Sequence, residues 1–563
     1  MQLSEQEQVR REKLIQLRAL GINPYPADLF PVDAMTADIK QNFENGKKVI
    51  IAGRLMSRRI QGKASFAELQ DSKGRIQVYF NRDEICPGED KVLYNEVYKK
   101  LLDIGDFIGV EGELFTTKVG EKTVMVKSFK LLSKSLKPLP LPKTDSEGNT
   151  FDEFNNPELR YRQRYADLVV NPKVKEVFIK RTKLFTAMRT FFNNSGYFEV
   201  ETPILQSIPG GAAARPFKTH HNSLDIPMFM RIACELYLKK LIVGGFDGVY
   251  EFAKTFRNEG MDRTHNPEFT MMEIYVAYKD YNWMMDLTEK LLEFCATEVN
   301  GSSKSIFGEH EINFKAPYAR VTMAESIEHH TGFDILGKSE NEIREAAKGM
   351  GIEVDETMGK GKIIDEIFGE KCEANYIQPT FITDYPKEMS PLTKEHRSNP
   401  DLTERFELII CGKELANAYS ELNDPIDQRA RFEDQVKLAG RGDDEATEFI
   451  DQDFLRALEY GMPPTSGMGI GMDRLIMFLT NNASIQEVLF FPQMKPEVKQ
   501  VAMSDDEKVV FNILKANSPF ELNELKIQSG LSNKKWDKTI KVLTKSGITK
   551  VNKTEEGLFV EVV

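Results

Sequence analysis

A charged segment between two strand-like runs restricts the possible folds of this chain more than its composition does. Residues 248–256 (GVYEFAKTF) alternate apolar and polar side chains, and residues 268–278 (EFTMMEIYVAY) do so until they become wholly apolar, which predicts an antiparallel hairpin. The segment between them carries Arg257, Glu259, Asp262, Arg263 and His265. A hairpin needs only a short turn, so ordering this longer loop is entropically unfavourable. We therefore expect the loop to bind a ligand.

A second predicted hairpin, residues 405–422 (RFELIICGKELANAYSEL), carries three glutamates in otherwise apolar surroundings. They are Glu407, Glu414 and Glu421. Burying unpaired carboxylates is strongly unfavourable, so the segment implies a cation. A salt bridge to Lys413 or Arg405 would explain any one of the three glutamates better than it explains all of them.

The strand period of two decides which of these side chains can share a surface. In the second hairpin it groups Asn417, Tyr419 and Glu421. Glu414 is out of phase and needs a β-bulge near Leu415 or Ala416 to join them. In the first hairpin the same period groups Phe269, Met271, Glu273 and Tyr275. Taken alone, that first segment fits a half-buried strand in which Glu273 forms a salt bridge better than it fits a binding surface.

Alternating glycines mark a third segment, residues 461–479 (GMPPTSGMGIGMDRLIMFL), which continues into an apolar helix. Gly467, Gly469 and Gly471 do not fit the dinucleotide fingerprint, since Met472 stands where a glycine is required. On a strand they leave one face bare, so a flat ligand or another backbone can approach closely.

Length and composition predict a globular cytosolic chain of about three or four domains, since 563 residues with 41% hydrophobic content suffice for several cores. The five cysteines stand far apart without a CxxC pair, so neither a zinc site nor a disulfide framework is expected. The first residues are charged, and no uncharged run approaches the roughly 18 residues of a membrane span, so no membrane partner is expected. The net charge of −12 argues against indiscriminate nucleic-acid binding but is blind to local patches.

The N-terminal part, residues 1–136, reads as a helix followed by a small closed β-barrel. Helical periodicity covers residues 4–20, and five short strands fall between residues 49 and 132, interrupted by a helical stretch at 96–102. On the first helix we place Arg10, Arg11, Lys13 and Arg18 on the outer surface.

The remainder predicts an α+β domain and a small helical unit. Residues 137–156, which open with the Pro-rich run KPLPLPK, are a linker. Residues 157–498 mix strands and helices without a regular repeat, which favours an antiparallel sheet, and include a long helix over 174–193. Residues 499–563 predict three helices and a two-stranded wing, a winged-helix-like extension.

Three segments resemble the signature motifs of class II aminoacyl-tRNA synthetases. Residues 196–205 (GYFEVETPIL) are similar to motif 1, residues 256–275 (FRNEGMDRTHNPEFTMMEIY) to motif 2 and residues 467–479 (GMGIGMDRLIMFL) to motif 3. The resemblance is greatest to the lysyl members and runs from the segment LGINPYP to the segment LFFPQMKP. It implies an OB-fold anticodon-binding domain, a catalytic domain with an antiparallel sheet, activation of L-lysine by ATP, and transfer of lysine to the 3′ end of tRNA(Lys).

The resemblance also implies a site for ATP and Mg²⁺ in which positioning and charge neutralisation carry the reaction without a general base. Adenine would lie between Phe269 and Arg474. Magnesium would bridge the phosphates from Glu407 and Glu414. The implied catalytic residues are Arg257 at the α-phosphate, Glu259 and Arg474, and the further ATP contacts are His265 at the terminal phosphates, Asn266 at the adenine, and Gly471.

The implied lysine pocket has an anionic end and an apolar wall, as a lysine side chain requires. Glu235 and Glu421, with Tyr275, would receive the ε-ammonium group. Tyr419 would pack along the methylenes. The other implied members are Gly211 near the amino group of the substrate, Glu273 and Asn417. An aspartate substrate would need a cation here, and the resemblance supplies none.

In the predicted barrel, Phe66, Gln77 and Arg58 match the anticodon readers of the family. Phe66 would stack on a base, Gln77 would read a base edge, and Arg58 would contact backbone or base. Without the resemblance, Phe66 reads equally well as a core residue. Motif 1 forms a homodimer interface in this family, so the 174–193 helix and Pro203 would be buried between subunits.

Other functions stay open at this point. A relative specific for aspartate or asparagine would keep the fold, and a paralogue could transfer lysine to a protein acceptor, although such paralogues lack the N-terminal barrel. A nucleic-acid-binding module without catalysis would need neither the three carboxylates nor the adenine clamp. Residues 533–553 carry seven lysines against one acid, Asp537, so the C-terminal part is either a tRNA-contacting module or a protein-interaction domain with solvated lysines.

Overall fold

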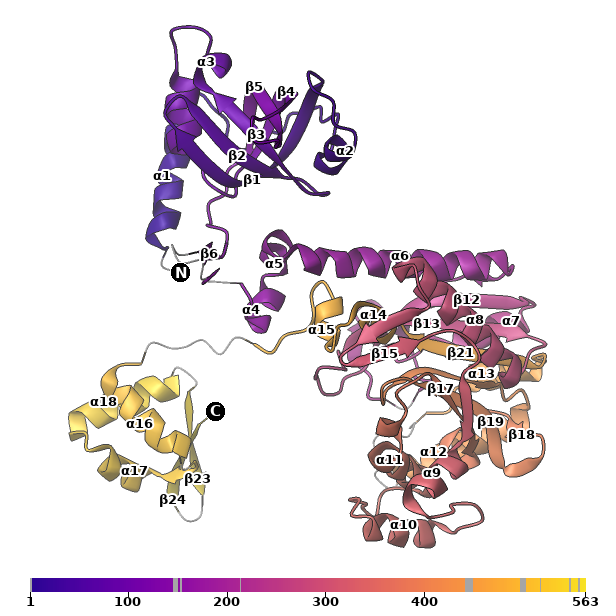
Figure 1. The fold of residues 1–563 in the computed structure, drawn as a ribbon. Coiled ribbons are helices and arrows are strands. Elements are labelled where there is room, and N and C mark those ends of the chain that lie inside the picture. The colour runs from indigo at the N-terminus through magenta and orange to yellow at the C-terminus, as the bar shows by residue number, and fades with distance from the viewer. Residues whose placement is uncertain are drawn as a thin grey trace. The chain divides into compact units, whose positions relative to one another are not determined.

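In the computed structural model the chain forms two compact units, Met1–Gln493 and Met494–Val563. The structure describes residues 3–144, 150–151, 154–212, 214–440, 449–496, 503–516, 518–545, 548–554 and 557–562. Within these ranges the first unit contains a five-stranded barrel and a nine-stranded sheet, and the second contains three helices and three strands (Figure 1). None of the described helices has the length and apolar character to cross a lipid bilayer.

The N-terminal domain is the predicted closed barrel. Its elements are α1 Glu5–Ala19, α2 Thr36–Gln41, β1 Lys48–Gln61, β2 Ala64–Gln70, β3 Arg75–Asn81, α3 Arg82–Ile85, the π-helix η1 Leu93–Leu101, β4 Phe107–Thr116 and β5 Lys122–Ser133. The strand order is β1-β2-β3-β5-β4, with η1 at the predicted helical interruption. Alternate residues such as Val49, Leu69 and Val78 fill the interior while their neighbours face outward. This is the OB-fold.

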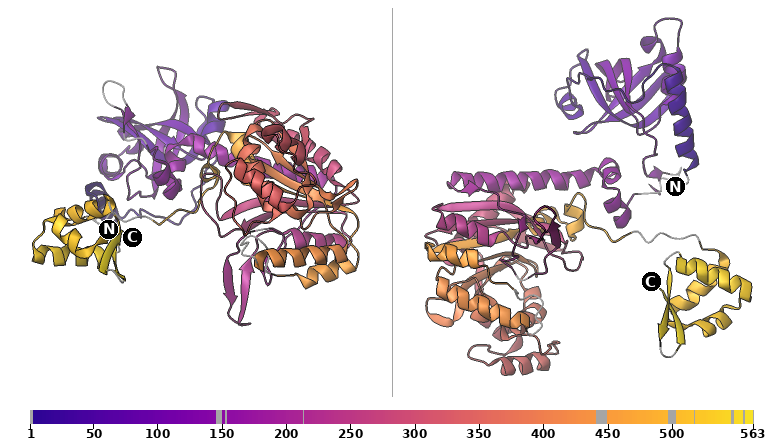
Figure 2. Two further views of the ribbon diagram at one scale, coloured as in Figure 1. Left: turned by 90° about the horizontal axis from the view of Figure 1, so that it is seen from below. Right: turned by 180° about the vertical axis from the view of Figure 1, so that it is seen from behind.

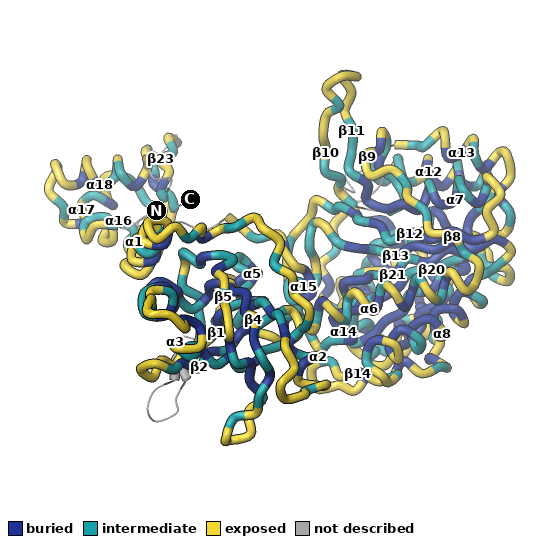
Figure 3. Tube along the Cα trace, turned by 90° about the horizontal axis from the view of Figure 1, so that it is seen from above, coloured by how far each residue is buried: buried dark blue, intermediate teal, exposed yellow. Residues whose placement is uncertain are grey.

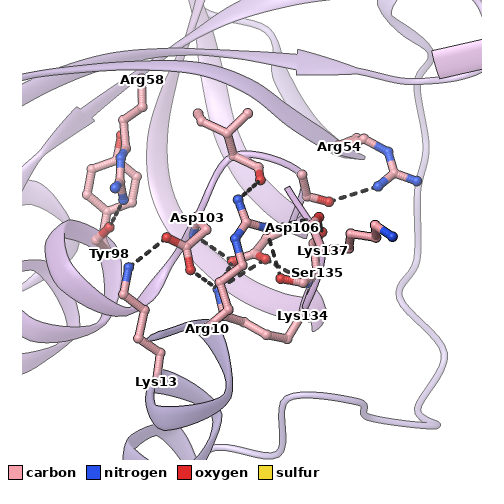
Figure 4. A network of polar contacts seen from close by, with 12 residues as sticks. Arg10, Lys13, Arg54, Arg58, Tyr98, Asp103, Asp106, Lys134, Ser135 and Lys137 are labelled. Carbon is pink, nitrogen blue, oxygen red and sulfur yellow. Dashed lines mark hydrogen bonds and ion pairs between the residues drawn. The ribbon is translucent and has the colours of Figure 1, made fainter. Parts of the chain in front are cut away.

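Helix α1 is attached to the barrel by two side chains that its periodicity predicted to be on the outer surface (Figure 4). Arg10 is only 8% exposed, because its guanidinium donates to the carbonyl oxygen of Ile104 at 2.9 Å. Lys13 donates to Asp103 at 2.6 Å, and Asp103 also accepts from the buried Lys134 at 2.6 Å. A carboxylate removed from water needs such cations. The outward prediction is therefore wrong for Arg10 and Lys13, because a helix period cannot reveal a partner about ninety residues away.

The large domain is built on the predicted mostly antiparallel sheet. Its strands are β8 Phe198–Glu199, β12 Gly248–Phe256, β13 Glu268–Ala277, β16 Ala319–Thr322, β17 Thr380–Pro386, β18 Glu395–His396, β19 Asn399–Ile409, β20 Glu414–Ser420 and β21 Thr465–Gly471. The order is β16-β17-β19-β20-β21-β13-β12-β8, with β18 on β19; the edge pairs β16–β17 and β12–β8 are parallel and the pairs between them antiparallel. The central strands β12, β13, β20 and β21 are largely buried (Figure 3).

Helices cover one face of this sheet (Figures 1 and 2). The long helix α6 Pro172–Asn194, the prediction for 174–193, packs there with α8 Tyr281–Asn300 and α14 Met472–Thr480. Side chains from all three share a buried cluster with Ile274 of β13 and Ala418 of β20. Because side chains alternate along a strand, the odd-numbered residues of β13 and β20 face the other side of the sheet.

Shorter elements complete the domain. They are β6 Lys143–Thr144, β7 Thr150–Phe151, α4 Pro157–Arg162, α5 Arg164–Val170, β9 Leu205–Gln206, β10 Lys218–His221, β11 Ile226–Met230, α7 Glu235–Val243, β14 Lys304–Phe307, β15 His310–Asn313, α9 Met323–Thr331, α10 Glu340–Gly349, α11 Lys360–Lys371, η2 Glu373–Asn375, η3 Lys387–Met389, α12 Pro425–Gly440, α13 Gln452–Glu459 and α15 Ile485–Val488. Helices α9 to α11 have a core of their own around Ile343 and Ile367.

The second unit has the predicted three helices and wing, with one additional short strand. It consists of α16 Asp505–Ala516, β22 Phe520–Glu521, α17 Leu522–Ser529, α18 Asn533–Lys545, β23 Thr549–Thr554 and β24 Gly557–Val562. The sheet order is β22-β24-β23. Leu514, Trp536 and Leu543 form its core together with Val560 of the wing.

Candidate active site

A cavity of about 740 Å³ lies on the sheet face opposite the helices. Nine residues of the predicted site line it: Gly211, Glu235, Arg257, Glu273, Tyr275, Glu407, Glu414, Asn417 and Tyr419. They come from β13, β19, β20, the start of α7 and two loops. The two predicted hairpins and the glycine-rich strand therefore converge on one site.

A β-bulge brings Glu414 to this cavity. The register of β19 and β20 shifts between Leu408 and Ile409, which leaves Leu415 without a partner. This is the bulge that the sequence pattern required, at one of the two positions predicted for it. As a result Glu414 lines the same cavity as Glu407 of the facing strand.

Glu407 lies close to both a cation and a second carboxylate. Its carboxylate accepts from the Arg405 guanidinium at 2.6 Å and from the Asn417 amide at 3.1 Å. Burial, followed by repulsion from Glu414, nevertheless raises the pKa of Glu407 to about 8. The salt bridge to Arg405 that the sequence offered as an alternative is thus present, and Glu414 lies 3.7 Å from the guanidinium of Arg474.

The predicted lysine pocket also contains a buried lysine of the chain itself, Lys239 of α7. Glu235 opens α7, and one turn later Lys239 donates to it at 2.6 Å and contacts the carboxylate of Glu421. The Tyr419 hydroxyl donates to the same Glu235 at 2.6 Å. Burial alone would lower the pKa of Lys239, but Glu235 and Glu421 raise it above its ordinary value. Lys239 was not predicted as a site residue, although its spacing of four from Glu235 on a helix was a usable signal.

Glu421 is buried behind the residues that line the cavity. It is 1% exposed and does not line the cavity, unlike the other predicted pocket residues. Burial raises its pKa well above the ordinary range, while Lys239 opposes that rise. Its contacts with the pocket are made through Lys239 and over Gly467.

Glu273 and Tyr275 form the neighbouring wall. The Tyr275 hydroxyl donates to Glu273 at 3.2 Å, and the backbone N–H of Cys234 donates to the other carboxylate oxygen at 3.4 Å. Burial, followed by the charge of Glu235, raises the pKa of Glu273 to about 7. The free pocket therefore holds a carboxyl group that titrates near neutrality.

The glycine-lined face of β21 is filled by side chains from neighbouring parts of the chain. A Cβ at Gly467 would lie 2.3 Å from both Glu421 Oε1 and Tyr275 Cε1. The prediction that a ligand or backbone fills this space is wrong at Gly467, because two side chains from neighbouring strands occupy it. At Gly469 the nearest atom to such a Cβ is the flexible end of Met271, at 3.0 Å.

The charged loop between β12 and β13 is shaped by hydrogen bonds within it. Asp262 accepts from the backbone of His265 at 2.8 Å and from the ring of the same histidine at 2.8 Å. Glu259 accepts from the backbone of Arg215 at 3.2 Å, and Asn266 donates to the carbonyl of Glu268 at 2.6 Å. Glu259, His265 and Asn266 are therefore held in the loop and do not line the cavity, whereas Arg257 at its start does.

Arg474 connects this loop to the acidic end of the cavity. Its guanidinium donates to the backbone oxygen of Glu414 and lies 3.5 Å from the Nε2 atom of His265. Phe269 stands on β13 with the Arg257 guanidinium 5.3 Å from its ring centroid. Gly471, the last predicted ATP residue, pairs with Met271. Arg474, Phe269 and Gly471 surround the start of the loop, but none of the three lines the cavity.

Two predicted anticodon residues lie on the outer face of the barrel. Phe66 is half-buried on β2. Leu69, on the opposite face of the strand, fills the barrel interior, so Phe66 is not a core residue. Its ring centroid is 4.9 Å from that of Tyr79. Gln77 on β3 donates to the Thr123 hydroxyl at 2.8 Å.

The third, Arg58, points away from Phe66. After the irregularity in β1, Arg58 pairs with Ala67 and Arg59 pairs with Phe66. Paired residues share a side of the sheet, so Arg59 lies 5.9 Å from the Phe66 ring, while Arg58 donates to the carbonyl of Tyr98 in η1. Arg59 was not predicted, because its position depends on an irregularity that the strand period does not reveal.

Comparison with known proteins assigns this architecture. The family model described as tRNA synthetases class II (D, K and N) matches residues 156–495, and the one described as OB-fold nucleic acid binding domain matches residues 49–132. The lysine–tRNA ligase of Christiangramia forsetii is 76% identical over 557 residues, which are 99% of this chain and 98% of that protein. The lysine–tRNA ligase of Azobacteroides pseudotrichonymphae is 63% identical over 498 residues, which are 88% of this chain and 99% of that protein. The chain belongs to the class II tRNA synthetases of the D, K and N group and, within it, to the lysine–tRNA ligase family.

Proposed function

We propose that this protein activates L-lysine with ATP, forming lysyl-adenylate and pyrophosphate, and transfers the lysyl group to the 3′ end of tRNA(Lys), releasing AMP. The charge balance of the buried pocket carries the proposal. Glu235, Glu273 and Glu421 share this region with the internal cation Lys239, so the pocket is anionic whenever at least two of the three carboxyl groups are ionised. Lysine brings two ammonium groups, whereas aspartate and asparagine bring one.

Arg257 is the group that we assign to the anions of the reaction. It lines the cavity, and its Nε atom is buried without a hydrogen-bond partner among the described residues. A buried donor of this kind fits an oxygen of the α-phosphate. Held there, the guanidinium would align the phosphate with the lysine carboxylate and take up charge as pyrophosphate leaves. No side chain has to act as a general base in that displacement.

Glu407 and Glu414 fit a magnesium site that the phosphates of ATP complete. Among the described residues no group of three or more His, Cys, Asp or Glu is arranged to hold a metal ion. Mg²⁺ characteristically takes one or two carboxylates and fills its remaining positions with phosphate oxygens and water. Burial, followed by repulsion from Glu414, raises the pKa of Glu407, and a bound cation would favour the ionised form of both carboxylates. When bound, the ion would supply charge neutralisation of the phosphates.

The outer face of the barrel fits unstacked bases of the anticodon. The Phe66 ring, flanked by Tyr79 and Arg59, is a stacking platform, and stacking contributes about 1–3 kcal/mol per base. Phe66→Ala should leave adenylate formation unchanged and lower the rate of tRNA charging at limiting tRNA. Equal losses in both assays would identify Phe66 as a folding residue.

Motif 1 fits a self-association surface, so we infer a homodimer. Phe198, Ile204 and Leu205 are 58%, 43% and 49% exposed, and Pro203 beside them is exposed as well. Apolar groups clustered in this way mark protein interfaces. Sedimentation of the full chain should give twice the monomer mass, and Leu205→Glu should shift it toward the monomer.

The reaction is tested by amino-acid-dependent exchange of pyrophosphate into ATP, run without tRNA and with lysine, aspartate and asparagine in parallel. We expect exchange with lysine alone. Exchange with aspartate or asparagine would contradict the assignment of the pocket, and no exchange with any of the three would contradict catalysis. Arg257→Ala should abolish the exchange while lysine binding stays measurable.

A further inference from the structure

Helix α18 presents a single row of lysines to solvent. The row consists of Lys534, Lys538, Lys541 and Lys545, which succeed one another at spacings of four, three and four residues. Such spacings place side chains on one face of an α-helix, and eleven residues span about 16 Å. All four lysines are exposed. The opposite face of the helix carries Trp536 and Leu543, which are buried in the core of the unit.

The positive charge of this unit is segregated onto α18 and the strand that follows it. Residues 533–553 hold seven lysines and one acid, and two of these lysines, Lys550 and Lys553, are exposed on β23. The rest of residues 503–563 holds three lysines and eight acids. Because the unit is nearly neutral overall, these lysines do not serve to raise its net charge.

The chain's own acids leave the row unneutralised. Within the described part of the unit, the ion pairs are Lys535 with Asp506 at 3.1 Å and Lys508 with Asp505 at 3.3 Å. Neither lysine belongs to the row. The row also contributes nothing to the core, since it points away from it. Four like charges aligned on a helix repel one another, so the arrangement is unfavourable without a partner.

The chemistry of the row fits a phosphate backbone better than a protein surface. Lysine is depleted in protein–protein interfaces, where buried aromatic and arginine anchors dominate. Lysines that contact successive phosphates, by contrast, release counterions and position a nucleic acid without reading its sequence. In winged folds of this kind the third helix and the wing lie together, and here α18 packs against β23.

The geometry points to a tRNA-binding surface formed by the α18 row, which contacts the phosphate backbone of the tRNA that the proposed function requires. The class II synthetase family model ends at residue 495, so almost the whole of this unit, Met494–Val563, lies beyond it. The surface therefore adds affinity for tRNA without taking part in adenylate formation. Its contacts are independent of sequence and sensitive to salt.

The test compares two full-length variants with equal loss of charge. The row variant combines Lys534→Gln, Lys538→Gln, Lys541→Gln and Lys545→Gln. The control variant combines Lys508→Gln, Lys515→Gln, Lys526→Gln and Lys535→Gln, in the same unit but off the row. Glutamine and lysine have similar helix propensities, and exposed ion pairs contribute little, so both variants should fold. Binding of tRNA(Lys) is measured at several salt concentrations, and pyrophosphate exchange with lysine is measured without tRNA.

We expect the row variant to bind tRNA at least about tenfold more weakly at low salt and to reduce the slope of log K against log salt by about three. The control variant should keep the affinity and slope of the natural chain, and exchange should be equal in all three proteins. Equal tRNA affinity and slope in the two variants would overturn the proposal and favour a protein partner. Loss of exchange in the natural chain would instead contradict the proposed function, which keeps the two failures distinguishable.

Discussion

Lys239 determines how two glutamates can lie together inside the protein. Its ammonium group is fully buried, 2.6 Å from Glu235 and in contact with Glu421. Each carboxylate would be strongly unfavourable there without a cation. The lysine thus fixes the shape of the pocket and leaves enough negative charge for a cationic substrate.

Replacing Lys239 alone should destabilise the protein more than replacing Lys239 and Glu421 together. Lys239→Met keeps the apolar stem but leaves the carboxylates unpaired, which should lower the free energy of unfolding by about 3–5 kcal/mol. Adding Glu421→Gln removes one stranded charge and should restore part of the loss. Urea unfolding of the two single variants and the double variant gives the coupling energy. Strictly additive effects would mean that Lys239 and Glu421 do not stabilise each other.

Lysine affinity should depend on pH through Glu273. Its pKa of about 7 in the free pocket means that the carboxyl is mostly protonated at pH 6 and mostly ionised at pH 8. A bound ammonium group favours the ionised form, so binding releases a proton below pH 7. Affinity should therefore rise up to tenfold per pH unit towards pH 7 and level off above it.

Calorimetry of lysine binding in buffers of different ionisation enthalpy measures this proton release directly. Glu273→Gln should bind more weakly and lose the pH dependence between pH 6 and pH 7. An unchanged pH profile in that variant would assign the titration to another group.

The limits of sequence inference are visible in these same residues. The Glu407 and Glu414 pair was predictable, because the glutamates stand out from an apolar strand and their phase can be counted. The partner of Asp103 was not, because Lys13 looks like an ordinary surface lysine of an amphipathic helix, and the spacing of Lys239 from Glu235 indicated a pair but not its burial. A charge is recognised as buried only once the element facing it is known.

The glycines of strand β21 leave space that side chains outside the strand occupy. Period two predicted the bare face and the β-bulge predicted the position of Glu414, since both depend on local geometry alone. What fills the bare face depends on β13 and β20, which the sequence of β21 does not specify. In β1, a register irregularity that the strand period does not reveal places Arg59, and not Arg58, beside the Phe66 ring.

Two glycines of β21 give matched substitutions with different expected results. Gly467→Ala would place a methyl group 2.3 Å from Glu421 and Tyr275, so either the strand or both side chains must move. We expect at least a tenfold rise in the KM for lysine in the exchange assay, together with a lower Tm. Gly469→Ala meets the flexible end of Met271 at 3.0 Å and the Cγ atom of Glu273 in ordinary van der Waals contact at 3.7 Å, and should change the lysine KM by less than threefold. Similar effects of both substitutions would mean that the packing over Gly467 is not specific to the pocket.

The chain consists of two compact units with separate cores. The sheet domain and the C-terminal unit bury different hydrophobic clusters, around Ile274 in one and Trp536 in the other. The sequence predicted this division through the loss of family resemblance and the change in charge after the LFFPQMKP segment. It did not predict the one-sided lysine row, which appears only when the α18 residues are placed around a helix axis.

Separate cores predict separate unfolding steps. Calorimetry of the full chain should show a small transition for the unit Met494–Val563, with an enthalpy of about 50 kcal/mol, besides the larger transition of the rest. Saturating lysine with a non-hydrolysable ATP analogue should raise only the larger transition, because ligand at 100 times its Kd stabilises its own unit by about 2.7 kcal/mol. A chain ending at residue 496 should lose the small transition and keep the ligand response of the other. A single transition that moves as a whole with these ligands would show instead that the two units unfold cooperatively.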